Sequence, residues 1–222
     1  MITLRIDEIH INGGLHRNRR RFQPILDLIA ETDPSILAIE YDPPRFERFV
    51  DNVLVDRTHC EPTDVFLAIF ASKALDIPLA LIDTGHTEAA VAAEARYRRE
   101  ISPERIDPAG RLREADSLAT VHRDLRRLET RAPDAYRALV HDRDRTMAGH
   151  LRALQQRDER VVAIVGENHT VGLRSYLMPP STLADAHVER PPIREPPRGP
   201  FEPWAARHLS YHPAMPNVTE TV

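Results

Sequence analysis

Apolar residues in this chain fall into short continuous runs that alternate with stretches of helical spacing. Residues 161–165 form one run of five apolar residues, three of them Val, which stops at Gly166. Strands that are apolar on both faces are typical of sheets covered by helices on both sides. Residues 35–42 and 77–83 contain runs of the same kind. Residues 4–11 alternate between apolar and polar instead, with one slip that a bulge would explain, and they predict a further strand.

The segments between these runs repeat apolar residues every three or four positions, which predicts helices. The predicted helices cover residues 17–31, 44–56, 63–75, 87–100, 112–131, 133–157 and 172–177, and Thr63 is a natural N-cap for the third of them. Strands that alternate with helices predict an α/β fold, in which a single domain over residues 1–178 has a largely parallel or mixed central sheet flanked by helices. Prolines crowd the chain from residue 179, so residues 179–222 are expected to form an irregular tail that is extended or disordered.

Composition narrows the classes of protein that fit. With 222 residues, 41% of them hydrophobic, the chain can bury a core as one domain. Its net charge of −4 argues against nucleic acid as the main partner. No apolar run approaches the roughly 18 to 20 residues that cross a bilayer, and the first residues do not resemble a signal peptide, so we expect a cytoplasmic location. Cys60 stands alone, which excludes a disulfide within the chain and a thiolate metal cluster.

Polar side chains follow each predicted strand. The first strand ends in Gly13-Gly14-Leu15-His16, the second in Glu40-Tyr41-Asp42, the third at Asp83, and the fourth in Gly166-Glu167-Asn168-His169. Parallel strands of one sheet end at the same edge, so two imidazoles and several carboxylates are expected to converge there. Imidazole and carboxylate groups are ordinary ligands of Zn²⁺ and similar ions. The sequence therefore predicts a binding site at this edge, although Asp83 is equally able to cap a following helix.

The candidate metal ligands are His16, His169 and Glu40, for a divalent ion of the Zn, Mn or Co type. Such an ion lowers the pKa of a bound water to about 7, and Glu40 or a neighbouring carboxylate would move the proton. We interpret Gly13 and Gly166 as positions where glycine permits an unusual φ or lets the backbone approach a ligand closely. The other candidate binding residues are Asp42, Asp83 and Glu167, with His10 as a candidate extra ligand.

These motifs resemble the TraB/PrgY/GumN family, which is related to the Tiki metalloproteases and more distantly to the ChaN and erythromycin esterase proteins. The resemblance covers most of residues 3–178. It consists of a GxxH motif at Gly13 and His16, the acidic strand end at Glu40 and Asp42, an Arg-Asp-x-x-Met helix over residues 143–147, and a second GxxH motif at Gly166 and His169.

The resemblance implies a metal-dependent peptidase in which His16, His169 and Glu40 are essential. It makes Arg143 a candidate to steady a substrate carbonyl or carboxylate, or to hold Glu40 through a bidentate pair. A salt bridge within the helix packing explains Arg143 equally well. Glu167 and Asn168 stand where relatives usually have small residues, which adds a carboxylate near the ligands. Many relatives also carry membrane segments after this domain, whereas a Pro-rich stretch follows here.

Three functions remain open from the sequence. The first is a metal-dependent hydrolase of peptide or amide bonds. The second, suggested by the erythromycin esterase relatives, is a His/Glu hydrolase of small esters or amides that needs no metal and survives chelation. The third is a non-catalytic protein that binds or sequesters peptides, as PrgY-like members are linked to the shutdown of peptide pheromones. The glycines lack the spacing of a dinucleotide-binding loop. The sequence does not indicate an oligomeric state.

Overall fold

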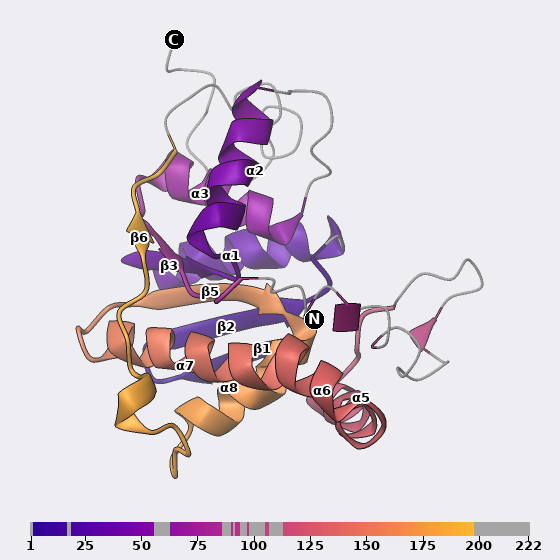
Figure 1. The fold of residues 1–222 in the computed structure, drawn as a ribbon. Coiled ribbons are helices and arrows are strands. Elements are labelled where there is room, and N and C mark those ends of the chain that lie inside the picture. Colours follow the sequence, from indigo (N-terminus) through magenta and orange to yellow (C-terminus); the bar gives the residue numbers. More distant parts are fainter. Residues whose placement is uncertain are drawn as a thin grey trace.

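The computed structural model describes residues 2–16, 19–55, 63–85, 90, 92–93, 97, 105–106 and 113–197. They contain one six-stranded sheet with the order β1-β2-β5-β3-β4-β6 (Figure 1). The strands are β1 (Ile2–Ile6), β2 (Ile9–Gly14), β3 (Ile36–Ile39), β4 (Leu79–Leu81), β5 (Val161–Gly166) and β6 (Ile193–Arg194). β2, β5, β3 and β4 run parallel, while β1 and β6 pair antiparallel at the two edges. This mixed sheet flanked by helices confirms the predicted α/β fold.

The first predicted strand is two strands. β1 and β2 form an antiparallel hairpin in which Ile6 pairs with Ile9 across a two-residue turn. Asp7 occupies the left-handed region with φ 51°, a conformation that Asp adopts more readily than most residues. The prediction of one bulged strand over residues 4–11 is therefore wrong, because the slip in the alternation marks a turn.

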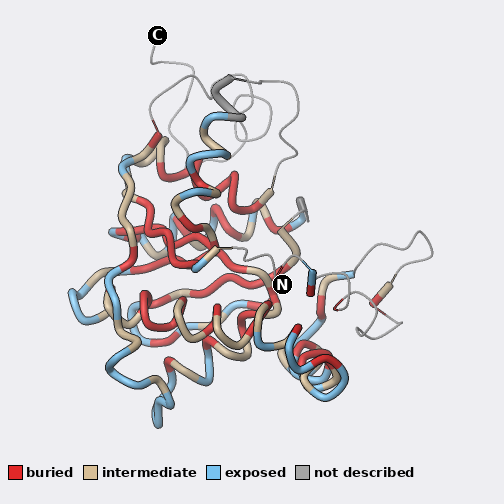
Figure 2. The backbone as a smooth tube through the Cα atoms, in the orientation of Figure 1, coloured by how far each residue is buried: buried red, intermediate tan, exposed pale blue. Residues whose placement is uncertain are grey.

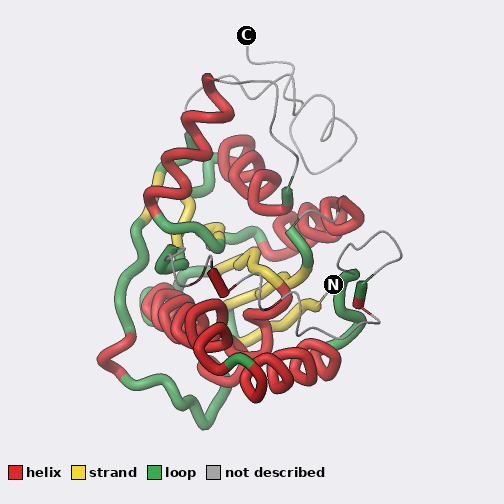
Figure 3. The backbone as a smooth tube through the Cα atoms, turned by 45° about the vertical axis from the view of Figure 1, so that its right-hand side comes forward, coloured by secondary structure: helices red, strands yellow, loops and turns green. Residues whose placement is uncertain are grey.

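Helices cover both faces of the sheet (Figures 1 and 3). On one face lie α1 (Phe22–Thr32), α2 (Pro43–Val55) and α3 (Asp64–Leu75), and on the other lie α7 (Asp142–Gln155) and α8 (Thr170–Leu177). β5 alternates between them: Val162 and Ile164 pack with the first group, and Val161, Ala163 and Val165 with the second. All of residues 161–165 are buried (Figure 2). Burial on both faces explains why this strand reads as a continuous apolar run.

Of two predicted helices, one begins at its predicted cap and the other is interrupted by a π-helical turn. α3 begins where the sequence places it, since the Thr63 hydroxyl accepts a hydrogen bond from the Phe66 backbone N–H at 3.1 Å. The predicted helix over residues 133–157 consists of α6 (Pro133–Tyr136), a π-helical turn η3 (Arg137–His141) and α7. α5 (Leu118–Arg131) precedes them and packs with α6 in a third apolar cluster.

The Pro-rich segment takes part in the fold as far as residue 197. After α8 the chain forms the short turn η5 (Asp185–His187) and then β6, whose Ile193 pairs with Ala80 of β4. The sequence analysis did not predict this edge strand, because a strand of two residues within a Pro-rich stretch carries no strand pattern. Residues 198–222, Cys60 and most of the predicted helix over 87–100 lie outside the described residues. None of the helices in the described part of the chain has the length and apolar character needed to cross a membrane.

Gly149 offers a test of how the Pro-rich segment docks on α7. A Cβ at Gly149 would overlap the backbone carbonyl of His187. Replacing a helix-interior glycine by alanine ordinarily stabilises a protein by about 0.5–1 kcal/mol. We expect Gly149→Ala to lower the free energy of unfolding instead, by about 1–3 kcal/mol, because the added methyl overpacks this contact. Urea denaturation measures the change, and a stabilised Gly149→Ala variant would contradict the described docking.

Candidate active site

Glu40, His16 and His169 come from three neighbouring parallel strands and meet at one edge of the sheet. Glu40 follows β3, His16 follows β2, and His169 ends the short 3₁₀ turn η4 (Glu167–His169) after β5. His16 Nε2 lies 3.4 Å from Glu40 Oε2, and His169 Nε2 lies 3.3 Å from Glu40 Oε1. The Glu40 carboxylate therefore lies between the two imidazoles, with one oxygen facing each ring.

Gly166 lies beside all three side chains. Its backbone N–H donates a hydrogen bond to Glu40 Oε2 at 2.6 Å. A Cβ at this position would lie 3.2 Å from Glu40 Oε2 and 3.3 Å from His16 Nε2. Gly166 has φ −65°, so the interpretation that it needs an unusual φ is wrong. Gly13 also lies in a strand, where a Cβ would overlap the side chain of Thr170, so both glycines provide room.

A buried carboxylate holds the far nitrogen of each imidazole. His16 Nδ1 lies 2.8 Å from Asp64 Oδ1, and His169 Nδ1 lies 2.5 Å from Asp144 Oδ1. Such a carboxylate keeps the proton on Nδ1 and directs Nε2 outward, which is the arrangement that orients metal-binding histidines. The sequence analysis did not select Asp64 or Asp144. The available signals were an acid at the start of an apolar helix and the Asp of the Arg-Asp-x-x-Met motif.

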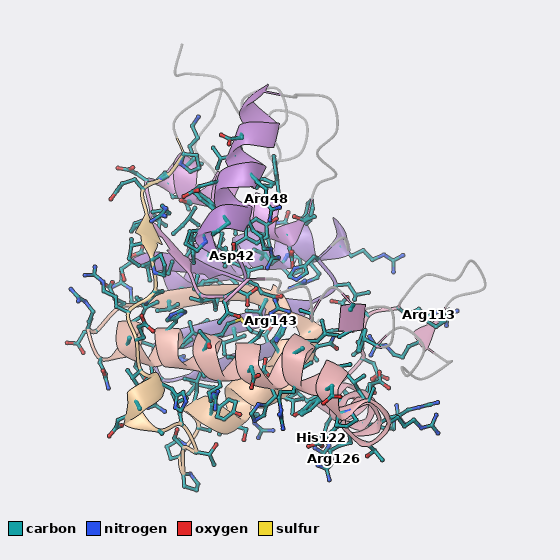
Figure 4. All side chains as sticks on the ribbon, viewed as in Figure 1. Asp42, Arg48, Arg113, His122, Arg126 and Arg143 are labelled. Atoms are coloured by element: carbon teal, nitrogen blue, oxygen red, sulfur yellow. The ribbon has the colours of Figure 1, made fainter. Side chains whose placement is uncertain are left out.

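Arg143 joins Glu40 to the neighbouring strand end. Its Nη2 donates to Glu40 Oε1 at 2.5 Å and to Asp83 Oδ2 at 2.7 Å, while Nε donates to Asp83 Oδ1 at 2.9 Å. The bidentate partner of Arg143 is thus Asp83, and Glu40 receives one bond. Nη1 donates to the Leu139 carbonyl at 3.2 Å in the π-helical turn. Figure 4 shows Arg143 at the centre of the molecule, above the ribbon of α7.

The other predicted binding residues have partners of their own. Asp42 caps α2, since its carboxylate accepts the Arg45 backbone N–H at 2.7 Å, and Asp83 also binds the Arg45 guanidinium at 2.7 Å. Glu167 contacts the Arg105 guanidinium and accepts the Ala115 N–H at 2.7 Å, so its carboxylate is engaged by Arg105 and Ala115 rather than by Glu40. His10 pairs with Val162 near the start of β5, four positions before the Gly14–Gly166 pair at the site.

Charge in this cluster is tightly coupled. Burial alone would lower the pKa of His16, but the carboxylates of Asp64 and Glu40 outweigh it and raise the pKa to about 10. Burial alone would also lower the pKa of His169, but the carboxylates of Glu40 and Asp144 outweigh it and raise the pKa to about 9. Burial raises the pKa of Asp144 to about 6 despite its imidazole partner. Burial alone would raise the pKa of Glu40, yet His169, Arg143 and His16 hold its pKa well below the usual range. Without a metal, both imidazoles are therefore protonated at neutral pH beside an ionised Glu40.

The donor types in this cluster, two imidazoles and a carboxylate, are ones that divalent ions commonly bind. Two atoms that each lie about 2.0–2.2 Å from one tetrahedral ion are about 3.3–3.5 Å apart. The two separations between imidazole and carboxylate are 3.4 and 3.3 Å, longer than ordinary hydrogen bonds. As they stand, however, no three or more His, Cys, Asp or Glu side chains in the described residues form a group that could hold an ion. Metal binding is accordingly a proposal that direct metal analysis tests.

Comparison with known proteins supports the family resemblance over part of the chain. The model of the TraB/PrgY/gumN family matches residues 97–178. This segment includes Arg143, Asp144 and the GxxH motif that ends in His169, whereas His16 and Glu40 precede it. No curated protein and no solved structure matches the chain.

The Arg143 pairs generate a prediction about stability. Arg143→Lys removes the bidentate geometry that holds Asp83 and weakens the bond to Glu40, which leaves two buried carboxylates incompletely paired. We expect the free energy of unfolding to fall by about 3–5 kcal/mol. Arg145→Lys is the matched control on the same helix, because Arg145 is half-exposed and lies 3.9 Å from Asp142. Equal stability of the two variants in urea denaturation would show that the Arg143 pairs do not support the fold.

The imidazole pKa values predict how the stability of metal-free protein depends on pH. Groups whose pKa is raised on folding stabilise the protein below their unfolded pKa of about 6.5, and that contribution disappears as pH rises through the folded pKa. For His169 and His16 the loss spans pH 6.5 to about 9 and about 10. We expect chelator-treated protein to lose stability across this range, measured by urea denaturation at several pH values. A His16→Gln/His169→Gln variant should show a shallower slope, and an equal slope would contradict the assignment.

Proposed function

We propose that this protein is a metal-dependent hydrolase of peptide or amide bonds, in which His16, His169 and Glu40 bind a divalent ion of the Zn, Mn or Co type. The observation that carries the proposal is the convergence of two imidazole Nε2 atoms on the two oxygens of one carboxylate, at 3.4 and 3.3 Å. The partial match to the TraB/PrgY/gumN family agrees with it. We also propose that the protein is related to the Tiki metalloproteases.

Each residue has a definite task in the proposed reaction. Asp64 and Asp144 hold the Nδ1 atoms, so both Nε2 atoms stay directed at Glu40. Arg143 and His169 occupy one oxygen of Glu40, while the other faces Gly166 N–H and His16. His16 is 35% exposed and the other two residues are buried, so water and substrate approach from the side of His16. Glu40 Oε2 lies on that side, and Glu40 acts there either as a ligand of the ion or as the base that moves the proton of the attacking water to the leaving amine.

When bound, a divalent ion supplies Lewis acidity and lowers the pKa of a coordinated water to about 7. The carboxylates of Glu40, Asp64 and Asp144 give the site the negative charge that favours a cation. His16 and His169 would hold the ion through their Nε2 atoms, in place of the protons that these atoms otherwise share with Glu40. Asp64 and Asp144 would still accept hydrogen bonds from the Nδ1 atoms of His16 and His169. These two buried carboxylates would therefore keep a donor with or without the ion.

A second candidate is a His/Glu hydrolase that needs no metal. Its support is the raised pKa of both imidazoles, about 10 for His16 and about 9 for His169, which keeps them protonated at neutral pH. Protonated His16 would then stabilise the oxyanion of an ester or amide at the exposed side, with Glu40 as the base. The two candidates differ in one respect that experiment can separate, namely whether activity survives removal of metal.

Metal analysis and peptide hydrolysis test the proposal together. We expect purified wild-type protein, or protein reloaded with Zn²⁺, Mn²⁺ or Co²⁺, to hold about one ion per chain by plasma mass spectrometry. His16→Ala and His169→Ala should each lose it, while the matched variant His141→Ala, at a half-exposed imidazole paired with Asp142, should keep it. Hydrolysis of a fluorogenic peptide library should fall by about 100-fold or more in the two site variants.

The outcomes separate the alternatives. Wild-type protein that holds no metal and cannot be reloaded overturns the metal-dependent proposal. Hydrolysis that persists after exhaustive chelation, and disappears in Glu40→Gln, supports the metal-free hydrolase. Peptide binding without turnover, unchanged in His16→Ala and His169→Ala of intact fold, supports a protein that only binds peptides.

A further inference from the structure

A groove of about 640 Å³ lies between α5 and α8. Its apolar lining comes from Leu118 at the start of α5, Val171 in α8, and Met178 with the two prolines that follow. His122 and Arg174 also line it, one from each helix. None of the groove's lining residues belongs to the Glu40 cluster, so this is a second concave surface on the same protein.

The charge of the groove differs from that of the whole chain. The protein carries a net charge of −4, yet no Asp or Glu among the described residues lines the groove. Within the described residues, the one hydrogen bond of the Arg174 side chain is from Nε to the Met178 sulfur at 3.3 Å, a weak acceptor. His122 makes no side-chain hydrogen bond or ion pair to the described part of the chain. Figure 4 shows His122 with Arg126 at the lower edge of the molecule, on α5. The groove therefore presents two basic side chains beside an apolar floor.

We propose that this groove binds the carboxyl terminus of a peptide whose last side chain is apolar. The Arg174 guanidinium has the planar donor geometry that matches a carboxylate, and His122 adds a donor from the opposite wall. Leu118 and Val171 form the floor for the last side chain. Met178 is an unbranched and adaptable side chain, suited to partners of different shape.

The exposure of the groove favours a peptide over a fatty acid. Met178 remains 39% exposed, the one large hydrophobic side chain in the described residues that is exposed. A wall that stays in water can cover one or two side chains, but it does not remove a long acyl chain from water. The proposal concerns binding alone, so it holds or fails independently of the metal and of the hydrolase activity.

Isothermal titration calorimetry at low salt tests the proposal with an acetylated pentapeptide that ends in Leu with a free carboxyl group. We expect the wild-type protein to bind it, and the same peptide with an amidated end to bind about 10-fold more weakly or worse, because a charge-assisted hydrogen bond is lost. Arg174→Gln should weaken binding to a similar extent. Arg126→Gln is the matched control, since Arg126 pairs with Glu129 on α5 and does not line the groove.

Two further variants locate the binding. Ala119→Trp places a bulky side chain in the groove and should abolish the titration signal, whereas Arg48→Gln, on α2 at the opposite face of the sheet, should leave it unchanged. Equal binding of the acid and amide peptides, or full binding by Arg174→Gln or Ala119→Trp, overturns the proposal. Decanoate that binds at the groove while the peptide does not would also overturn it, in favour of a fatty acid site.

Discussion

The buried charge of Glu40 is the constraint on which the arrangement of this protein depends. An ionised carboxylate removed from water is strongly unfavourable unless cations and donors surround it. Here Arg143, His16, His169 and the Gly166 N–H provide them, and they come from three separate parts of the chain. The α/β fold makes this possible because its parallel strands all end at one edge. Folding and the assembly of the site are therefore the same event, since neither the carboxylate nor its partners can be buried alone.

The partners extend outward in layers. Each imidazole that faces Glu40 is backed by its own buried acid, and Asp64 is in turn held by Arg21, which also donates to Asn12 of β2. Positive and negative groups alternate outward from the carboxylate, so each buried charge of this network has an opposite neighbour. Such a network gives rigid orientation to the central groups. The same alternation of charges stabilises imidazoles whose Nε2 atoms carry a proton and imidazoles whose Nε2 atoms bind an ion. The network is therefore compatible with both hydrolase proposals.

Sequence pattern predicted the parts of the structure that depend on local chemistry. The continuous apolar run of β5, the Thr63 cap and the polar strand ends all follow from single segments. The hairpin at Asp7 was missed because one irregular step fits a bulge as well as a turn. Asp64 and Asp144 were missed for another reason: an acid in a helix has an ordinary solvated explanation, and only three-dimensional packing shows that it backs an imidazole. Glu167 illustrates the converse, because its position beside the site does not reveal that its carboxylate faces Arg105.

The π-helical turn before α7 has a consequence for the phase of the helix. A π turn accommodates one residue more than regular α-helix, and one residue corresponds to about 100° of rotation. Arg143 and Asp144 are consecutive, and together they reach Glu40 and His169. A chain shortened by one residue within Arg137–His141 would form an uninterrupted helix whose two ends are out of phase by that angle. Either the packing of α6 against α5 or the pair of contacts at Glu40 and His169 would then be lost. The extra residue therefore sets the rotation of α7 so that both the α5–α6 contact and the contacts at the sheet edge can form.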